Sequence, residues 1–336
     1  MKKIKVGING FGRIGRLLLR IICERNDMEV VAINNPRLTG EYAHYQFTHD
    51  TIFGRFNGKC SFKDDVLVVN GKKIQIFGGE EPKLIPWDTA GVDVVCDATG
   101  VFKTFEALKP HLKGSVKKVI LTAPAKDDVP MFVYPVNTNE YTNDMQIISA
   151  SSCTTNCLAP ILKVLDDNFE IEEAFMTTIH SATATQKVVD GSSKKDFRGG
   201  RAASYNIIPS SSGATAAAGK VVKNLQGKIT GLAFRVPTLD VSVVDLTAKI
   251  NKSASYEKIV AAFKKAEKGE YLGVIKTTTE PAVSSDFIGE SATCVLDITA
   301  GMSLSNNFVK LVAWYDNEYG YSQQVVNLIE YIFKKK

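Results

Sequence analysis

The sequence predicts an α/β protein in which a doubly wound parallel sheet comes first and an α+β part with a largely antiparallel sheet follows. Three observations predict it. A strand-like run from Ile4 to Ile8 passes through a glycine-rich turn into an amphipathic helix, and a second strand passes into a helix at Cys153. Farther on, apolar residues alternate from Val241 to Ile250, and helical spacing follows up to Phe263. The length of 336 residues suits about two domains.

Composition and charge restrict the class of protein. Hydrophobic residues make up 44% of the chain and charged residues 23%, as in ordinary globular proteins. The net charge of +5 is too small to indicate a nucleic-acid or membrane partner. The 6 cysteines lack zinc-ligand spacing, so we expect no metal site, no disulfide framework and a reducing compartment. No signal-peptide region or bilayer-length apolar run is present, which favours the cytoplasm.

The first strand ends in a glycine pattern. Gly10, Gly12 and Gly15 complete G-x-G-x-x-G between strand and helix. One glycine permits a tight turn, one lets the backbone approach a pyrophosphate, and one lets the helix pack on the strand. A glycine-rich turn without a ligand is the alternative, but the strand–turn–helix context favours a dinucleotide site.

The second strand, Val30 to Ile33, ends beside the position that usually selects the cofactor. An acidic residue there usually binds the adenosine ribose, but this chain has Asn35, with Arg37 close behind. An amide does not repel the extra phosphate of NADP, and an arginine can pair with it. Asn35 can also simply bond the ribose hydroxyl. We expect NAD as the main cofactor and leave NADP open.

Two more apolar strands end in small polar residues, at residues 92–100 and 119–124. Ligands of doubly wound sheets bind outside the carboxyl ends of the strands. Thr99 and Thr122 are therefore candidates to line the cofactor groove, although ordinary strand-end polar residues would look the same. Residues 40–90, rich in turn signals, predict short strands and hairpins, with His44 and His49 structural or exposed.

Cys153 follows a short apolar strand and opens a helix. Free N–H groups and the positive helix end favour a thiolate, which makes Cys153 a candidate nucleophile, with an inert core cysteine as the alternative. His180 lies in a β-rich segment 27 residues later and is a candidate base for the thiol, although a lone histidine is often structural. Pro160 inside the helix predicts a kink.

Three features beyond Cys153 suggest anion binding or assembly. Residues 185–206 are polar, basic and aperiodic, which is typical of a functional or interface loop or of disorder. Ser210 to Gly213 precede an alanine-rich helix, as a cap or as an anion site. Arg235 stands alone in an apolar strand, where it either forms a buried ion pair or presents its guanidinium to an anion.

Taken together, these segments resemble phosphorylating glyceraldehyde-3-phosphate dehydrogenase over essentially the full length. The segments that carry the resemblance are Asn9 to Gly15, Ser152 to Asn156, His180 with Thr183, Phe234 to Pro237, and Trp314 to Glu318. The resemblance implies a Rossmann-type domain of residues 1–152 completed by residues 316–336, and a catalytic domain of residues 153–315. It also implies a homotetramer, in which residues 185–206 lie near the cofactor of a neighbouring subunit.

The resemblance also implies roles. Cys153 would attack the aldehyde of glyceraldehyde 3-phosphate, and His180 would move the protons. Inorganic phosphate would then release the acyl group from the thioester. The implied substrate and phosphate contacts are Ser152, Thr154, Thr183, Ser212, Gly213 and Arg235. The implied cofactor contacts are Gly10, Phe11, Gly12, Arg13, Ile14, Gly15, Asn35, Thr99, Thr122 and Asn317, with Arg13 and Ile14 binding the pyrophosphate through their backbone and Thr122 and Asn317 at the nicotinamide end.

This sequence departs from the family pattern at four positions. Asn35 replaces the usual aspartate, Arg37 stands where an apolar residue is common, and Ser192 stands where NAD-specific members usually have proline. These three departures favour dual or NADP use. Ser212 replaces the usual threonine and keeps the hydroxyl.

Two other functions stay open. One is a related aldehyde dehydrogenase, acting on erythrose 4-phosphate or without phosphate. The other is a catalytically silent nucleotide-binding or RNA-binding protein, which the presence of Cys153 and His180 disfavours.

Overall fold

The computed structural model describes residues 3–193 and 196–335, so Lys194 and Lys195 of the basic loop lie outside the described residues. The chain divides into two compact units. Unit 1 comprises the chain up to Phe132, Glu140–Ser151 and the chain from Ser322 onward, and unit 2 comprises Val133–Asn139 and Ser152–Tyr321. The return to unit 1 at Ser322 comes later than the predicted boundary at residue 316.

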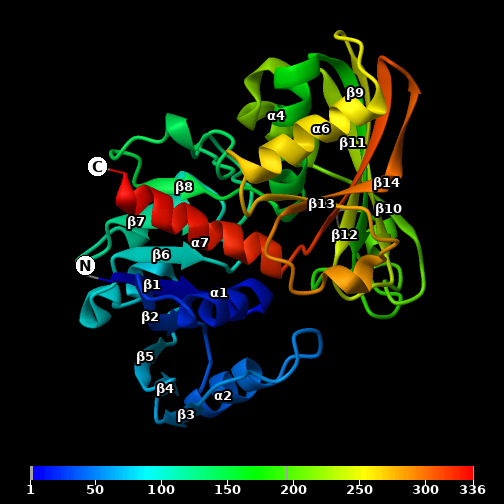
Figure 1. Ribbon diagram of the computed structural model, residues 1–336. Helices are drawn as coiled ribbons and strands as arrows, with labels where there is room; N and C mark the ends of the chain where they lie inside the picture. The colour runs from blue at the N-terminus through cyan, green and yellow to red at the C-terminus, as the bar shows by residue number, and fades with distance from the viewer. Residues whose placement is uncertain (1–2, 194–195, 336) are drawn as a thin grey trace. The chain divides into compact units, whose positions relative to one another are not determined.

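Unit 1 is built on a sheet of order β3-β4-β5-β2-β1-β6-β7-β8. From β5 to β8 all neighbouring strands are parallel, whereas β3, β4 and β5 pair antiparallel at one edge. The doubly wound parallel sheet is thus confirmed, with an antiparallel edge added (Figure 1). The strands are β1 (Ile4–Asn9), β2 (Met28–Asn34), β3 (Cys60–Lys63), β4 (Val66–Val69), β5 (Lys72–Phe77), β6 (Val94–Asp97), β7 (Lys118–Leu121) and β8 (Ile147–Ser149).

Two helices from opposite ends of the sequence belong to this unit. α1 (Arg13–Cys23) buries an apolar face of leucines and isoleucines, as its spacing predicts. α7 (Tyr319–Lys334) joins unit 1 from Ser322 on, and its Glu330 pairs with Arg25 at 2.5 Å. The shorter elements are α2 (Gly40–Thr48), α3 (Phe105–Leu108) and the 3₁₀ turns Pro82–Leu84, Trp87–Ala90 and Lys109–His111; a further 3₁₀ turn, Thr138–Glu140, ends the short Val133–Asn139 segment.

The helix α2 corrects the expectation that residues 40–90 contain only strands and hairpins. Thr39 caps it by accepting the Tyr42 N–H at 3.2 Å. Its buried residues include Gly40, Ala43 and Phe47, so the apolar stripe has one large side chain and gives a weak periodic signal. Packing against the neighbouring strands, more than local propensity, stabilises this helix.

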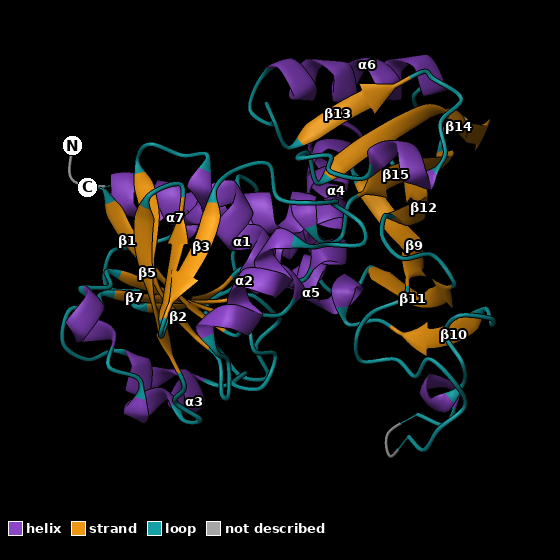
Figure 2. Cartoon of the chain, turned by 90° about the horizontal axis from the view of Figure 1, so that it is seen from below, coloured by secondary structure: helices purple, strands orange, loops and turns teal. Residues whose placement is uncertain are grey.

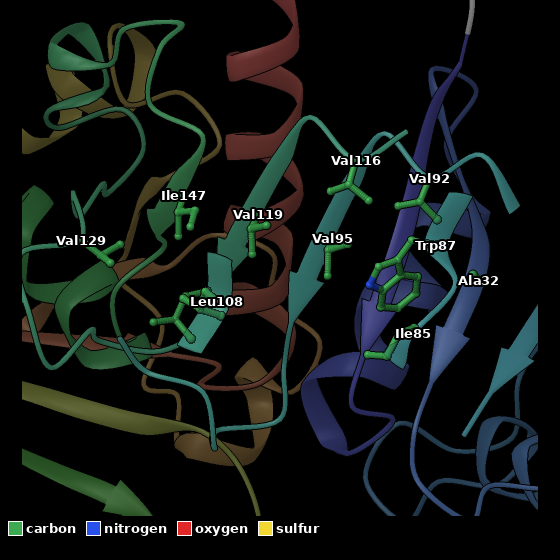
Figure 3. Close-up of a cluster of buried hydrophobic side chains, with 11 residues drawn as sticks. Ala32, Ile85, Trp87, Val92, Val95, Leu108, Val116, Val119, Val129 and Ile147 are labelled. Atoms are coloured by element: carbon green, nitrogen blue, oxygen red, sulfur yellow. The ribbon is translucent and has the colours of Figure 1, made fainter. Parts of the chain in front are cut away.

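The core of unit 1 lies between the parallel strands and the segments that connect them (Figure 3). Val95, Val119 and Ile147 come from three strands, and Trp87 comes from a 3₁₀ turn and is fully buried. Strands buried on both faces explain why these runs are almost continuously apolar.

Unit 2 is built on a second sheet, of order β10-β11-β9-β12-β15-β14-β13. The pairs β11–β9 and β13–β14 are parallel and the other neighbouring pairs are antiparallel, so the largely antiparallel sheet is confirmed. The strands are β9 (Ile171–Ser181), β10 (Ile208–Ser211), β11 (Ile229–Val236), β12 (Ser242–Ile250), β13 (Ile275–Thr278), β14 (Cys294–Ser305) and β15 (Phe308–Tyr315).

Helices cover one side of this second sheet (Figure 2). They are α4 (Cys153–Phe169), α5 (Ala214–Val221) and α6 (Tyr256–Lys268), with 3₁₀ turns at Arg198–Gly200, Lys223–Leu225 and Ser284–Phe287. α4 continues through Pro160 as one element, and the kink at Pro160 stays a prediction. Within the described residues, no helix combines the length and apolar character that crossing a bilayer requires.

Candidate active site

The candidate nucleophile occupies the first position of a helix. Ser152 caps α4 by accepting the Thr155 N–H at 3.1 Å, and Cys153 is the first helical residue. Immediately before the cap, Ser151 has a φ of 60°, a strained value for a residue other than glycine. The Cys153 side chain is half-buried, whereas Cys157, one turn later, is fully buried. Cys153 is therefore accessible to a small molecule.

His180 faces this thiol. It lies near the end of β9, is 4% exposed, and its Nε2 lies 3.5 Å from the Cys153 Sγ. This distance suits a hydrogen bond to sulfur and a proton transfer. The pairing of candidate nucleophile and candidate base is therefore present in unit 2.

Arg235 reaches the same histidine because two strands hold the two residues in register. In the parallel pair β11–β9, Arg235 stands opposite His180. The Arg235 Nη1 lies 2.7 Å from His180 Nδ1 and 3.3 Å from the Ser181 carbonyl oxygen. The His180 Nδ1 also lies 2.9 Å from that carbonyl oxygen. No carboxylate partner of Arg235 is present among the described residues that contact it, so the guanidinium is available to an anion.

The electrostatics differ from the sequence expectation. Burial raises the pKa of the Cys153 thiol, and the Arg235 charge and hydrogen bonds from Thr154 lower it only in part. The expected lowering of the thiol pKa at the helix start is therefore wrong for the chain by itself, because desolvation outweighs the helix end. Burial and the Arg235 charge lower the pKa of His180 to about 3, so the imidazole is neutral at neutral pH.

A buried hydroxyl network, not predicted from the sequence, supports both residues. The Tyr315 hydroxyl lies 2.9 Å from Thr154 Oγ1 and 2.8 Å from Thr178 Oγ1. The Tyr315 ring meets the His180 ring edge-on, with 6.0 Å between centroids. Burial alternates along β15 and places Tyr315 on the inner face. The sequence signal that could have found it is its place in Trp314 to Glu318, one of the segments that carry the family resemblance. The Thr154 hydroxyl is used in this network, and its role in substrate binding stays a prediction.

Asn317 is held by two hydroxyls. Its Oδ1 accepts hydrogen bonds from Ser181 Oγ at 2.9 Å and Ser242 Oγ at 2.7 Å. Ser242 Oγ also accepts the Ser181 backbone N–H at 3.1 Å. These bonds fix the amide plane of Asn317, whose cofactor contact stays a prediction.

The remaining predicted anion contacts make local bonds. Thr183 Oγ1 lies 3.1 Å from Thr185 Oγ1, and Ser212 Oγ accepts the Ala214 N–H at 3.2 Å beside the start of α5. Gly213 is exposed, with open space where a side chain would stand. No direct contact joins these three to Cys153 among the described residues, so their roles stay predictions.

The glycine turn of unit 1 has the shape that a dinucleotide requires. Gly10 has a φ of 95°, and a Cβ on Gly15 would lie 2.0 Å from the Gly10 carbonyl oxygen. At Gly12, by contrast, nothing lies within 4 Å of a Cβ position. Two glycines are thus required by the turn and its packing, and the third leaves open backbone beside the start of α1, where a pyrophosphate fits.

A cavity of about 340 Å³ adjoins this turn. Its lining residues come from the ends of the parallel strands and from the turn: Asn9, Gly10, Gly12, Asn34, Asn35, Pro36, Gly79, Glu80, Ala98, Thr99, Val101 and Phe102. Gly10, Gly12, Asn35 and Thr99 of the predicted cofactor residues therefore share one cavity. The residues present fit an adenosine with its pyrophosphate.

The other predicted cofactor residues lie around the turn. Phe11 is buried, and its N–H donates to Asn35 Oδ1 at 3.2 Å. The Arg13 side chain forms an ion pair with Asp50, which leaves only its backbone for a ligand, and Ile14 is half-buried in α1. The Thr122 hydroxyl donates to the Asp97 carbonyl oxygen at 3.0 Å and is not part of the cavity lining.

Comparisons with known proteins agree with this geometry. Residues 4–105 match the family described as glyceraldehyde 3-phosphate dehydrogenase, NAD binding domain, and residues 152–317 match its C-terminal domain. Glyceraldehyde-3-phosphate dehydrogenase 3 of Saccharomyces cerevisiae is 54% identical, over 98% of this chain and 99% of the relative. Cytosolic glyceraldehyde-3-phosphate dehydrogenase of Sinapis alba is 53% identical, over 99% of each chain. Glyceraldehyde-3-phosphate dehydrogenase of Ogataea parapolymorpha is 56% identical, over 98% of each chain. The chain therefore belongs to the glyceraldehyde 3-phosphate dehydrogenase family.

Proposed function

We propose that the chain oxidises glyceraldehyde 3-phosphate with NAD and inorganic phosphate to 1,3-bisphosphoglycerate. The observation that carries the proposal is the 3.5 Å contact between Cys153 Sγ and His180 Nε2, with Arg235 beside the same histidine. A nucleophilic thiol, a base and a guanidinium without a carboxylate partner among the described residues are the groups that a phosphorylated aldehyde and an attacking phosphate require.

The chain's own residues supply the acyl-transfer chemistry. Cys153 sulfur attacks the aldehyde carbon, and the thiol proton passes to His180 Nε2 and on to the new hydroxyl, giving a thiohemiacetal. A bound nicotinamide would supply the acceptor for the hydride of that carbon. His180 Nε2 removes the hydroxyl proton in that step and leaves a Cys153 thioester. A phosphate oxygen then attacks the thioester carbon, the C–S bond breaks, and the Cys153 thiolate is released with an acyl phosphate.

The test is initial rates of NADH formation with and without inorganic phosphate, for the wild type, Cys153→Ser and Cys157→Ser. We expect phosphate-dependent turnover that Cys153→Ser reduces by orders of magnitude, whereas the buried Cys157→Ser retains most of it. Turnover that does not need phosphate would indicate a non-phosphorylating dehydrogenase. A preference for erythrose 4-phosphate would indicate the related phosphorylating enzyme.

We propose NAD as the main cofactor, with NADP also accepted. Asn35 lines the adenosine cavity as an uncharged amide, and the exposed Arg37 follows two residues later. Ser192 lies in the described part of the loop but has no contact that bears on this choice. Direct binding of both cofactors, measured by calorimetry, tests the preference.

We propose a homotetramer with no nucleic-acid partner. The described residues of the 185–206 loop expose large apolar side chains: Val188 is 75% exposed, Val189 73%, Phe197 90% and Tyr205 88%. Such side chains on a loop are typical of a protein interface. Light scattering after gel filtration should give four times the 36.7 kDa chain mass. A monomer would contradict the proposal.

We also propose a cytoplasmic location, since two relatives of this chain, from Sinapis alba and from Mesembryanthemum crystallinum, are named cytosolic. Cell fractionation against a cytoplasmic marker tests it.

A further inference from the structure

One charged side chain lines the cavity beside the glycine turn of unit 1. Among the lining residues, all of which lie in the described part of the chain, Glu80 alone carries a charge. It is exposed and follows the end of β5 at Phe77 by three positions. No hydrogen bond or ion pair holds its carboxylate among the described residues. The carboxylate is therefore available to a molecule that binds in the cavity.

The backbone next to Glu80 is held by the neighbouring strand. Asn34 is 1% exposed and ends β2, and its amide bonds Gly79 twice: Oδ1 accepts the Gly79 N–H at 2.8 Å, and Nδ2 donates to the Gly79 carbonyl oxygen at 2.9 Å. The Asn35 N–H donates to the Phe77 carbonyl oxygen at 3.0 Å. These three bonds join the segment after β5 to the end of β2, so a fixed backbone carries Glu80 at the cavity.

The amide at the usual ribose-binding position already has partners within the protein. In doubly wound folds, an acidic residue after the second strand accepts hydrogen bonds from the adenosine ribose. Asn35 holds that place here, but its Oδ1 accepts the Phe11 N–H at 3.2 Å and its Nδ2 donates to the Pro36 carbonyl oxygen at 3.2 Å. A ribose hydroxyl that donates needs an acceptor, and the carboxylate of Glu80 offers two oxygens on the same cavity lining.

The cation that could favour an extra phosphate is not part of this lining. Arg37 is exposed, has a φ of 62°, and is absent from the residues that line the cavity. A ligand in the cavity therefore meets the negative charge of Glu80, although the nearness of Arg37 to Asn35 in the sequence suggests a positive one.

We propose that Glu80 is a specificity-determining residue of the cofactor site: its carboxylate accepts hydrogen bonds from the adenosine ribose of NAD and repels the 2′-phosphate of NADP. This rests on the proposed function, in which the cavity binds the adenosine of the cofactor. A charge on the lining of a cavity of about 340 Å³ lies close to any group bound there, where salt screens it less than on an open surface. The acidic residue missing after β2 is thus replaced by one after the adjacent strand β5, which makes NADP the weaker ligand.

The test is calorimetric binding of NAD and of NADP to the full chain, for the wild type and Glu80→Gln. Glutamine keeps the size of the side chain and removes its charge. The Kd for NADP should fall by about 10-fold, because the repulsion is lost. The Kd for NAD should rise by about 2–3-fold, because an amide oxygen accepts a weaker hydrogen bond than a carboxylate does.

Glu81→Gln is the matched control. Glu81 is the next residue, pairs with Lys83 at 2.8 Å and does not line the cavity. This variant removes the same charge from the same segment and should leave the ratio of the two Kd values within about twofold of the wild-type ratio. Both variants should unfold at the wild-type temperature, because an exposed ion pair contributes little to stability. Added salt should reduce the difference between the wild type and Glu80→Gln, as expected for an effect of charge.

The outcome separates this inference from the proposed function. A ratio of Kd values that Glu80→Gln leaves unchanged, or that Glu81→Gln changes equally, would overturn the role of Glu80 and leave the enzyme reaction intact. Tighter binding of NADP than of NAD by the wild type would overturn it as well. A wild type that binds neither cofactor would contradict both the inference and the proposed function.

Discussion

The two units each bury a histidine, and their different partners suit a structural role for one and the proposed catalytic role for the other. In unit 1, Trp87 Nε1 donates to His111 Nδ1 at 3.0 Å, and His111 Nε2 lies 3.3 Å from Asp97 Oδ2. An indole N–H can only donate, so Nδ1 is bare and Nε2–H bonds the carboxylate. In unit 2, His180 has a carbonyl and a guanidinium competing for one nitrogen.

The two shorter contacts of His111, from Trp87 and to Asp97, agree on one tautomer, and Asn9 Nδ2, 3.5 Å from the same Nε2, donates to Asp97 Oδ2 at 2.8 Å. Asn9 Oδ1 in turn accepts a hydrogen bond from Asn34 at 2.8 Å. Such a fully satisfied network stabilises a single structure. At His180 the partners disagree, and one side of the ring meets a half-buried thiol. Two groups that require opposite protonation states of Nδ1 thus lie beside a histidine whose Nε2 faces the Cys153 thiol.

Of the predictions that test the difference between His180 and His111, the largest effect is expected on turnover. His180→Asn should reduce kcat by about 10²–10⁴-fold, because the thiol loses its proton acceptor. The melting temperature should change little, since Arg235 Nη1 and the Ser181 oxygen still bond each other. Steady-state kinetics and thermal unfolding on one preparation check both. Normal kcat with a large loss of stability would reverse the assignment of the two histidines.

The next effect is on stability. His111→Phe keeps the ring but leaves the Trp87 N–H and the Asp97 carboxylate without their partner, which should cost about 2–4 kcal/mol. The melting temperature should fall by about 5–10 °C with kcat within about twofold. The control is His44→Phe, since His44 bonds only the Cys60 carbonyl oxygen near the surface and should change stability by less than about 0.5 kcal/mol. Equal losses of stability in His111→Phe and His44→Phe would contradict the structural role of His111.

How much of this was predictable depends on whether a feature is local in the sequence. The glycine turn and the position of Cys153 at a helix start are short patterns, and the structure has both. His180 was found by its chemistry, as a base for the thiol. His111 was missed because its partners Trp87 and Asp97 are meaningful only once the sheet brings them together.

Register and long-range packing are the parts that the sequence could not supply. Arg235 was expected to bind an anion or an ion-pair partner, but its place opposite His180 follows from the pairing of strands about 50 residues apart. Tyr315 bonds Thr154 across 161 positions. The helix α2 has too few large apolar residues for a periodic signal, and the thiol pKa depends on burial, which no local motif reports.

Asp240 in unit 2 is a buried carboxyl group whose oxygens lack the side-chain hydrogen bonds that Asp97 has among the described residues. Burial and the charges of Asp316 and Glu318 raise the pKa of Asp240 to about 8. The folded chain therefore holds this proton more tightly than the unfolded chain, and the free energy of unfolding falls as pH rises from about 4 to about 8. Asp240→Asn cannot ionise, so it should be more stable than the wild type at pH 8, on the order of 2 kcal/mol, and equal to it at pH 4.

Denaturant unfolding at several pH values measures this difference. Asp245→Asn is the matched control on β12, because Asp245 pairs with Lys310 at 2.6 Å and gains nothing from losing its charge. A gain at pH 8 that is absent in the control supports a protonated Asp240 in the folded chain. If Asp240→Asn raises the free energy of unfolding equally at pH 4 and pH 8, the stabilisation does not come from the raised pKa of Asp240.

The smallest predicted effect is on cofactor binding and concerns Asn35. Its amide Oδ1 accepts a hydrogen bond from the Phe11 N–H, as a carboxylate oxygen would. Asn35→Asp can keep that bond, so NAD binding should change by less than about twofold. The added charge would lie on the lining of the cavity beside the glycine turn, the proposed adenosine site, where it should repel the extra phosphate of NADP. We expect the Kd for NADP to rise by about 5–10-fold, roughly 1 kcal/mol. Calorimetry with both cofactors checks it, and Asn70→Asp, on a remote turn of the same unit, is the control for added charge. An equal loss for NAD and NADP would mean that Asn35 positions the glycine turn and does not discriminate between the cofactors.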